Sequence, residues 1–378
     1  MRPSIFQYIL NFILFLMLLF PLFKVYRGSK IVYKPIRFSQ QQTLLYAFTL
    51  MTLSVFGFSD YDFWGCMQGY INYKKNSVSG VYEPFYEWLT DITPNYFVWR
   101  FIVWGIAVYL MVKTLNRLRV NFNATYLFIT LLYVLSFYKL RNVLGFSVMF
   151  WGLSLIIRPG GKHRTTSIIS GMIFIILSFW CHKTMIISIA LLICCYFKFT
   201  KARLNVLILA WPFLIYVVTV LLSNFTAGLI VLENNDMGLA SRAMTYATNE
   251  GETSNLNGMI RTVIIESAVI IPLIYVTKKI VYQHEFIPTI IKYFYRYWFA
   301  TTYIAYLFAF QNAANWIYIR IATMGYFPMC IVLGWYWANH RRTLAQRLII
   351  LLCLLAYSYS TFYMVYKMDL INTVSINL

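Results

Sequence analysis

Three polar side chains interrupt a long apolar run in the segment YKLRNVLGF, residues 138–146. They are Lys139, Arg141 and Asn142. A planar guanidinium at a tight corner between helices is suited to bidentate contact with phosphate. Arg141 is therefore a candidate for holding a phosphorylated ligand, with Lys139 and Asn142 beside it as candidate binding residues. The alternatives are a structural role for Arg141 and a lysine that extends to lipid headgroups.

Two further apolar runs carry basic groups near their centres. His182 and Lys183 lie in CHKT, and Arg320 ends the segment QNAANWIYIR. His182 could accept a proton, contact a phosphate or close a helix through a hydrogen bond. Lys183 could bind the ligand or extend to headgroups, and Arg320 could bind the same anion or pair with Glu266.

Glu83 is the main acidic candidate, in the segment YEPFY. The proline that follows holds the backbone of Glu83 extended. Flanking aromatic bulk, beginning with Tyr82, would raise the pKa of the carboxyl and suit it to be a general base. A solvated loop glutamate is the alternative.

Asp60 and Asp62 form a DYD element upstream. They are candidate ligand-binding residues or a mark of the membrane boundary, and without a further acid or histidine nearby we expect no metal site. The six cysteines have no metal or disulfide spacing, so we interpret them as small hydrophobic residues. No cofactor is expected.

Composition determines which elements must position these residues. With 60% hydrophobic, 19% aromatic and 12% charged residues, the chain is not a soluble globular protein. The net charge of +20 does not indicate nucleic-acid binding, because lysines and arginines cluster between apolar runs and act as topology signals. We expect an all-α polytopic membrane protein whose 378 residues form one transmembrane domain.

Dividing the apolar runs by length predicts about twelve transmembrane helices. Residues 124–157 form one run of 34 residues, which as a helix would reach about 51 Å across a core of roughly 30 Å, so the run must fold back near Arg141. Similar corners are predicted at CHKT and before Arg320, all facing outward. Long outward loops are predicted at 59–96, with short interfacial helices, and at 223–258. The spans are 5–23, 43–58, 97–112, 124–138, 142–157, 165–181, 184–199, 204–222, 260–277, 297–311, 316–338 and 345–366.

Four segments, in this order, resemble the EpsG-like branch of the Wzy-type polysaccharide polymerases. They are SDYDFW, YEPFY, LRNVLGFSVMFWGLSL and SFWCHKTMII. Members typically show an aromatic-Glu-Pro element, an arginine followed by a polar and small apolar residues, and a Phe-His-Ser-like corner, which here reads WCHKT. The likeness is strongest over residues 40–200.

The resemblance implies a glycosyltransferase that extends capsule, exopolysaccharide or O-antigen chains. The growing glycan would move from undecaprenyl diphosphate to the nonreducing end of a new lipid-linked repeat unit, at the outer face of the bacterial inner membrane. Arg141 and Arg320 would neutralise the departing diphosphate, assisted by Lys139 or Lys183. Glu83, or His182, would deprotonate the acceptor hydroxyl. Loop aromatics would stack on sugars, namely Trp64, Tyr70, Tyr82, Tyr86 and Trp88.

Partners implied by the resemblance are the lipid-linked oligosaccharide, a chain-length regulator and a flippase for lipid-linked glycans. Two other functions stay open. One is a membrane glycosyltransferase that uses a polyprenyl monophosphate sugar, and the other is a flippase, which would need its site near the bilayer midplane.

Overall fold

The structure is a computed structural model that describes most of the chain between residues 61 and 339. The described ranges are 61–76, 83–118, 140–157, 165–183, 185–195, 200–207, 256–282, 287–307 and 315–339, with scattered positions at 210–217 and 345–356. Side chains at 61–65, 256–266 and 315–320 lie outside the description. Helices, and no strands, make up the regular structure of these residues, as an all-α protein requires.

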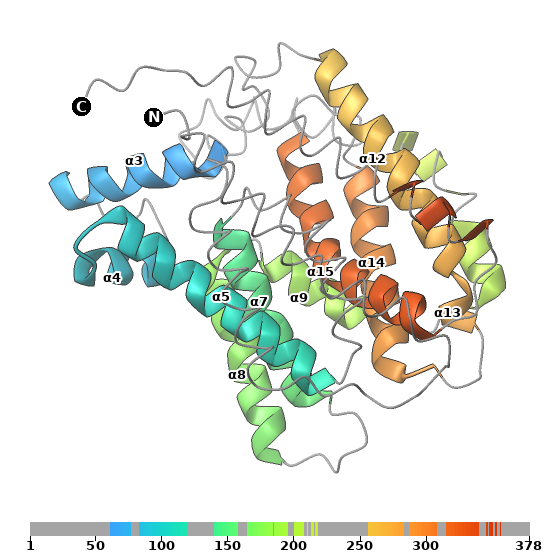
Figure 1. Ribbon diagram of the computed structural model, residues 1–378, viewed down its shortest axis with the longest axis horizontal. Coiled ribbons are helices and arrows are strands. Elements are labelled where there is room, and N and C mark those ends of the chain that lie inside the picture. The colour runs from blue at the N-terminus through green and yellow to red at the C-terminus, as the bar shows by residue number, and fades with distance from the viewer. Residues whose placement is uncertain are drawn as a thin grey trace.

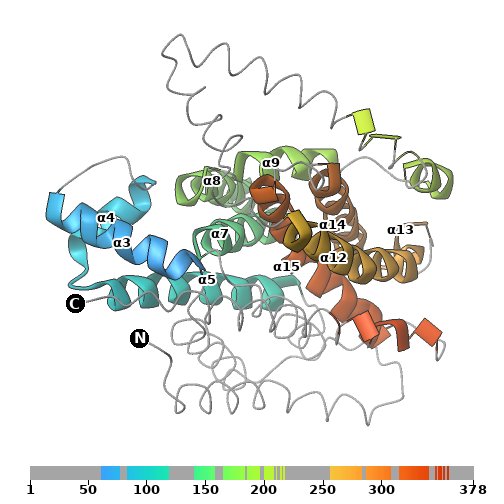
Figure 2. The same ribbon diagram turned by 90° about the horizontal axis from the view of Figure 1, so that it is seen from above.

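Two short helices follow one another at one end of the molecule (Figures 1 and 2). They are α3, Tyr61–Asn76, and α4, Pro84–Ile92. Proline suits the first position of α4 because its ring sets a helical φ and it has no N–H to satisfy. The hydroxyl of Tyr70 on α3 donates to the carbonyl oxygen of Thr93 at the end of α4, at 2.9 Å, and joins the two helices.

Three long helices form the next part of the bundle: α5, Tyr96–Leu118, α7, Leu140–Ile156, and α8, Thr165–Cys181. Helix α7 packs against both α5 and α8 (Figure 2). Gly152 of α7 and Gly171 of α8 meet at the crossing, where a Cβ added to either glycine would lie 2.6 Å from the other's carbonyl oxygen. Small residues let helix backbones approach this closely.

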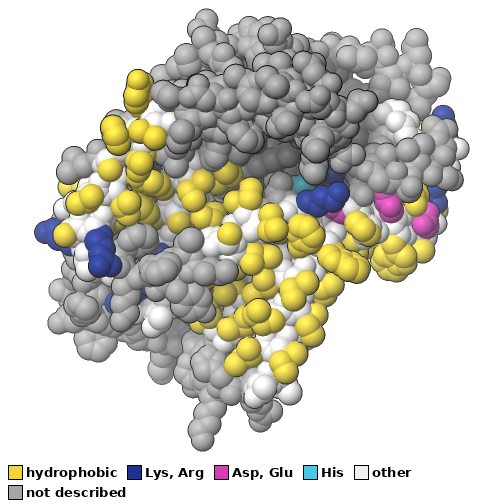
Figure 3. Space-filling view, turned by 180° about the vertical axis from the view of Figure 1, so that it is seen from behind, with side chains coloured by type: hydrophobic (Ala, Val, Ile, Leu, Met, Phe, Trp, Pro, Cys, Tyr) yellow, Lys and Arg dark blue, Asp and Glu magenta, His cyan; other side chains and the backbone are white. Residues whose placement is uncertain are grey.

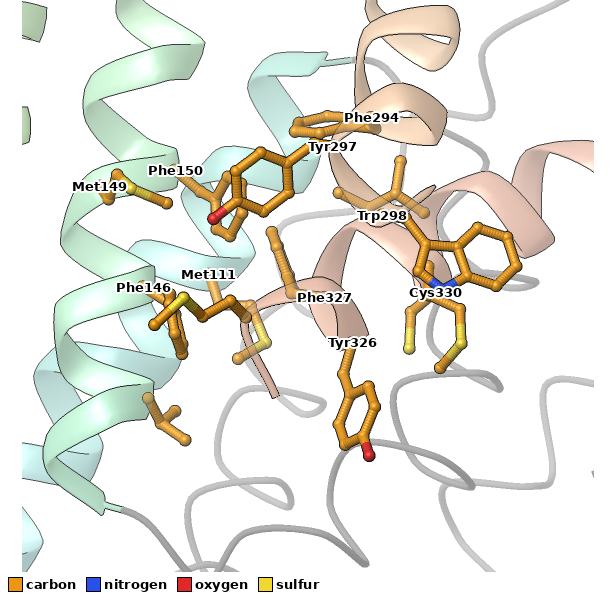
Figure 4. Packing of buried hydrophobic residues seen from close by; sticks show 14 of the residues in the cluster. Met111, Phe146, Met149, Phe150, Phe294, Tyr297, Trp298, Tyr326, Phe327 and Cys330 are labelled. Atoms are coloured by element: carbon orange, nitrogen blue, oxygen red, sulfur yellow. The ribbon is translucent and has the colours of Figure 1, made fainter. Parts of the chain in front are cut away.

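The remaining helices pack on the other side of α7. They are α9, Met185–Cys194, α12, Leu256–Thr277, α13, Lys279–Tyr282, α14, Thr289–Leu307, and α15, Asn315–Asn339. Helices α14 and α15 pack closely together. Aromatic side chains from α7, α14 and α15 interlock around Phe150, as Figure 4 shows.

One helix of the described residues, Tyr96–Leu118, is long and apolar enough to cross a membrane by length and composition. Shorter apolar helical segments accompany it, namely Leu140–Ile156, Thr165–Cys181 and the Ile321–Trp337 part of α15. The exposed side of α8 is apolar along its length, with Ile169, Ile173, Ile176 and Trp180 all exposed. Figure 3 shows such hydrophobic side chains as a broad continuous face, which is typical of a surface in contact with lipid.

Several predicted spans coincide with observed helices. The span at 165–181 matches α8, and those at 142–157 and 316–338 match α7 and α15 within two residues. The span at 297–311 is wrong at its start, because α14 begins at Thr289. Lys292 and Arg296 made the first turns look like a polar connection, yet both side chains are only partly exposed.

Other predictions lie outside the described residues. These are the spans at 5–23, 43–58 and 124–138, the last with the predicted fold-back before Arg141, and nearly all of the 223–258 loop. The number of twelve spans therefore stays a prediction. In the 59–96 loop the structure has the helices α3 and α4, and their place at the membrane interface also stays a prediction.

Candidate active site

A tight corner between α8 and α9 positions His182. The N–H of His182 donates to the Ser178 carbonyl at the end of α8, and the His182 carbonyl accepts from the N–H of Met185, where α9 begins. The side chain of Met185 lies 3.0 Å from the point that a Cβ on Gly145 would occupy. A glycine on α7 thus lets the corner lie close to the second turn of that helix. The chain turns between α8 and α9 within the predicted CHKT element, and the outward direction of this corner stays a prediction.

Glu83 lies at the start of α4 with extended backbone, at φ −66° and ψ 149°. This conformation is the one expected before proline. The Glu83 side chain is buried, with its two carboxylate oxygens in different contacts. Oε1 lies 2.7 Å from Nδ1 of His182, and Oε2 lies 3.2 Å from Nη1 of Arg141. We call these three side chains the polar cluster. Arg141 is 58 residues and His182 is 99 residues from Glu83 in the sequence.

The expectation of a raised pKa for Glu83 is wrong. Burial raises the pKa of this carboxyl, but the hydrogen bond with His182 and the charge of Arg141 outweigh burial and hold the pKa at about 2. The sequence showed the aromatic neighbours but not the cationic partners, which come from other helices. Glu83 is therefore an ionised carboxylate at neutral pH and a poor proton acceptor.

The charge of Glu83 also determines the tautomer of His182. A carboxylate can only accept hydrogen bonds, so Nδ1 of His182 carries the proton and donates a hydrogen bond to Oε1. In the neutral ring the lone pair is then on Nε2. This arrangement of carboxylate and imidazole is the one in which histidine acts as a base and the acid orients it.

Arg141 and Asn142 lie in the first turn of α7. The Arg141 side chain is 26% exposed, so part of it is accessible from outside the cluster. Asn142 is 3% exposed, and no hydrogen bond from its Nδ2 is found among the described residues. An unsatisfied buried donor requires an explanation, and its place beside Arg141 makes it a candidate ligand contact.

The structure places the other predicted site residues less completely. Lys183 follows His182 directly and is exposed. Lys139, Asp60 and Tyr82 lie outside the described residues. Asp62 lies on α3 and Arg320 lies on α15, but their side chains are likewise outside the description.

The described loop aromatics do not all offer a face to sugars. Tyr70 and Tyr86 are buried, so their predicted stacking role is wrong. They pack instead against Trp99 of α5, which sequence spacing within the loop could not reveal. Trp88, on the outer side of α4, is 58% exposed and keeps an accessible ring.

Sequence reasoning missed one charged residue in this part of the molecule. Arg100 lies in the second turn of α5 and is almost fully buried. An arginine inside an apolar span is a functional candidate by default, which was the available signal. No group of three or more His, Cys, Asp or Glu side chains able to hold a metal occurs among the described residues.

Figure 3 shows histidine, cationic and acidic side chains close together at the edge of the hydrophobic face. Charged side chains beside a hydrophobic face are suited to a ligand with a polar head and an apolar tail. Acid, imidazole and guanidinium together can move a proton and bind an anion.

Comparison with known proteins identifies the family of the chain. A family model, described as the EpsG family, matches residues 43–375. No curated protein and no solved structure matches the chain. The match covers nearly the whole sequence, including every element of the polar cluster, and the chain therefore belongs to the EpsG family, which makes it an integral membrane protein of polysaccharide biosynthesis.

Proposed function

We propose that the protein is a polymerase that transfers a growing glycan from undecaprenyl diphosphate to the nonreducing end of a lipid-linked repeat unit. The observation that carries this proposal is the polar cluster, in which the Glu83 carboxylate contacts both His182 and Arg141. Family membership supports the substrate class, a lipid-linked glycan in a membrane. The reaction faces the cell exterior or periplasm, as the basic connections on the other side of the spans indicate.

His182 is the proposed general base. The acceptor hydroxyl oxygen attacks the anomeric carbon of the donor sugar, and its proton passes to Nε2 of His182. The bond between that carbon and the diphosphate oxygen breaks, and its electron pair leaves with the lipid diphosphate. Glu83 is the positioning residue that orients the imidazole and stabilises the imidazolium that forms, since its pKa of about 2 keeps it charged.

Arg141 is the proposed contact for the leaving diphosphate. A guanidinium has five N–H donors, and the contact with Glu83 uses Nη1. The Glu83–Arg141 pair has no net charge, so a diphosphate needs additional cations. Lys183, exposed beside His182, is suited to supply one, with Lys139 and Arg320 as further candidates.

Asn142 and Trp88 are the proposed contacts for the rest of the ligand. The buried Nδ2 of Asn142 can donate to a phosphate or sugar oxygen. The exposed ring of Trp88 can stack on a sugar of the glycan, because apolar sugar faces pack on aromatic rings. Asp60, Asp62 and Tyr82 belong to the same segment and are proposed to bind the glycan with them.

The test is reconstitution of the purified protein in liposomes with an undecaprenyl-diphosphate-linked repeat unit. We expect wild type to produce a ladder of glycans that grows in steps of one repeat unit. Arg141→Ala and His182→Gln should reduce ladder formation about 100-fold or more, the usual effect of losing a catalytic proton acceptor or charge contact. Lys113→Ala is the matched control, since Lys113 is an exposed cation 17 residues along α5 from Tyr96.

The possible outcomes test the proposed function and the assignment of the site residues separately. A wild-type protein that leaves repeat units unextended contradicts the polymerase proposal. Addition of one sugar from a polyprenyl monophosphate donor would support the glycosyltransferase alternative instead, and movement of lipid-linked units across the bilayer would support the flippase. Undiminished ladders from both variants would contradict the residue assignment alone.

A further inference from the structure

Tyr86 lies where three helices meet beside the polar cluster. Its backbone N–H donates to the Glu83 carbonyl at 2.9 Å, in the first turn of α4. Its carbonyl accepts from Nε1 of Trp99 on α5 at 3.5 Å. Its hydroxyl donates to the carbonyl oxygen of Arg141 on α7 at 3.4 Å. One fully buried residue thus contacts α5 and α7 and adjoins the acid of the cluster.

Packing explains the ring of Tyr86 but not its hydroxyl. The ring packs against Phe85 and Trp99, contacts that a phenylalanine would also make. A buried hydroxyl needs a hydrogen-bond partner, and burying it has a free-energy cost that a phenylalanine would avoid. A role for the hydrogen bond of the Tyr86 hydroxyl would explain why the residue is a tyrosine. Burial raises the pKa of Tyr86 well above its ordinary value, which keeps the hydroxyl protonated and able to donate.

The bond acts on the turn of α7 that carries Arg141. In a helix, the Arg141 carbonyl accepts from the N–H of Gly145, and its second lone pair can accept from Tyr86. A contact at this carbonyl limits rotation of the first turn of α7, and so the direction in which the guanidinium leaves the helix. At 3.4 Å the bond is longer than the usual O–H···O bond, so we expect its loss to cost little stability.

We propose that Tyr86 is a positioning residue of the site, which holds Arg141 against Glu83 through the hydrogen bond from its hydroxyl to the Arg141 carbonyl. This inference rests on the proposed function for its kinetic consequences, but its structural consequence is independent of any activity.

Tyr70 offers a matched control. It is also buried, also contacts the ring of Trp99, and donates its hydroxyl to a backbone carbonyl, that of Thr93, at 2.9 Å. Its bond joins α3 to the end of α4 and makes no contact with Arg141. Loss of the shorter bond, from Tyr70 to Thr93, should lower stability at least as much as loss of the bond from Tyr86. A comparison of the two variants therefore distinguishes an effect on the position of Arg141 from an effect on folding.

The kinetic experiment compares Tyr86→Phe with Tyr70→Phe in the reconstituted assay. Tyr86→Phe should lower kcat about tenfold, equal to about 1.4 kcal/mol, with KM changed less than about twofold. Tyr70→Phe should lower Tm and leave kcat within about twofold of wild type. In an Arg141→Ala background, Tyr86→Phe should have no further effect on kcat, because the two residues act as a unit. Equal loss of kcat in both tyrosine variants, or additive loss in the Arg141→Ala background, would overturn the inference.

A second measurement does not need activity. The chain has four histidines, so histidine-selective ¹⁵N labelling gives few signals, and His182→Gln identifies those of His182. His182 and Arg141 share the Glu83 carboxylate, so a displaced Arg141 should shift the Nδ1 resonance of His182. We expect this shift in Tyr86→Phe and not in Tyr70→Phe. An unchanged His182 resonance in Tyr86→Phe would overturn the inference, whereas absent ladders in wild type would overturn only the proposed function.

Discussion

The acid of the polar cluster and the aromatic core around Phe150 are both buried, but different forces hold them in place. At the cluster, an ionised acid is removed from water and compensated by one histidine and one arginine from other helices. In the core, Phe150 of α7 lies 5.7 Å from Phe294 and 5.2 Å from Phe327, centroid to centroid, with no charge involved (Figure 4).

This difference suggests that the polar cluster serves function and that the aromatic core serves stability. Breaking one partner of a buried ion pair leaves an uncompensated charge, whereas replacing the pair by apolar residues is often neutral or stabilising. An ion pair is therefore a poor choice for stability alone. Interlocked aromatic rings gain dispersion energy without a desolvation cost. We expect substitutions at the polar cluster to lower activity more than stability. We expect substitutions in the aromatic core to lower stability more than activity.

The largest effect on activity is expected from Glu83→Gln. The amide cannot stabilise an imidazolium or pair with Arg141, so turnover should fall about 100-fold or more, while shape is kept. Ladder formation in liposomes measures this loss. Glu87→Gln, four residues along α4, is the matched carboxylate control and should stay within about twofold of wild type. Equal losses in both variants would mean that the cluster has no special role.

Phe150→Ala should reverse the pattern. Removing a buried phenylalanine ring costs about 3–5 kcal/mol of stability, because the space it leaves is only partly refilled. Thermal unfolding in detergent should show a large fall in Tm, with turnover per folded molecule close to that of wild type. Loss of turnover in molecules that remain folded would show that core and site are coupled.

A smaller loss of stability is expected from Gly152→Ala. The added Cβ would lie 2.6 Å from the backbone oxygen of Gly171, which cannot move without separating α7 from α8. Overpacking of this kind costs about 1–3 kcal/mol. Gly145→Ala is the matched control, because its neighbour is the flexible side chain of Met185 at 3.0 Å. A Tm that falls equally in both variants would contradict the importance of the glycine crossing.

Acid should also lower the stability of the protein. The pKa of Glu83 is lowered from 4.5 to about 2 in the folded protein, so the stability it contributes is present above pH 4.5 and is lost as pH falls toward 2. Between those values Tm should fall less in Glu83→Gln than in wild type, because the amide does not titrate. Parallel decreases in the two proteins would contradict the ion pair.

The sequence by itself determined the class of the protein and much of its helical order. Hydrophobic content excludes a soluble protein, and the length of the apolar run at 165–199 demands the corner at which His182 is found. The sequence also singled out Glu83, Arg141 and His182, since ionisable groups beside apolar runs are costly and so conspicuous.

Only the tertiary structure decided how these residues act. Partners 58 and 99 residues apart cannot be paired from local pattern, yet they lower the pKa of Glu83 and thereby move the proposed base to His182. The burial of Tyr86 and its hydroxyl contact with Arg141 depend likewise on how α4 packs against α5 and α7. A pKa and a side chain's accessibility are set by surroundings in space, and the surroundings along the chain give only part of them.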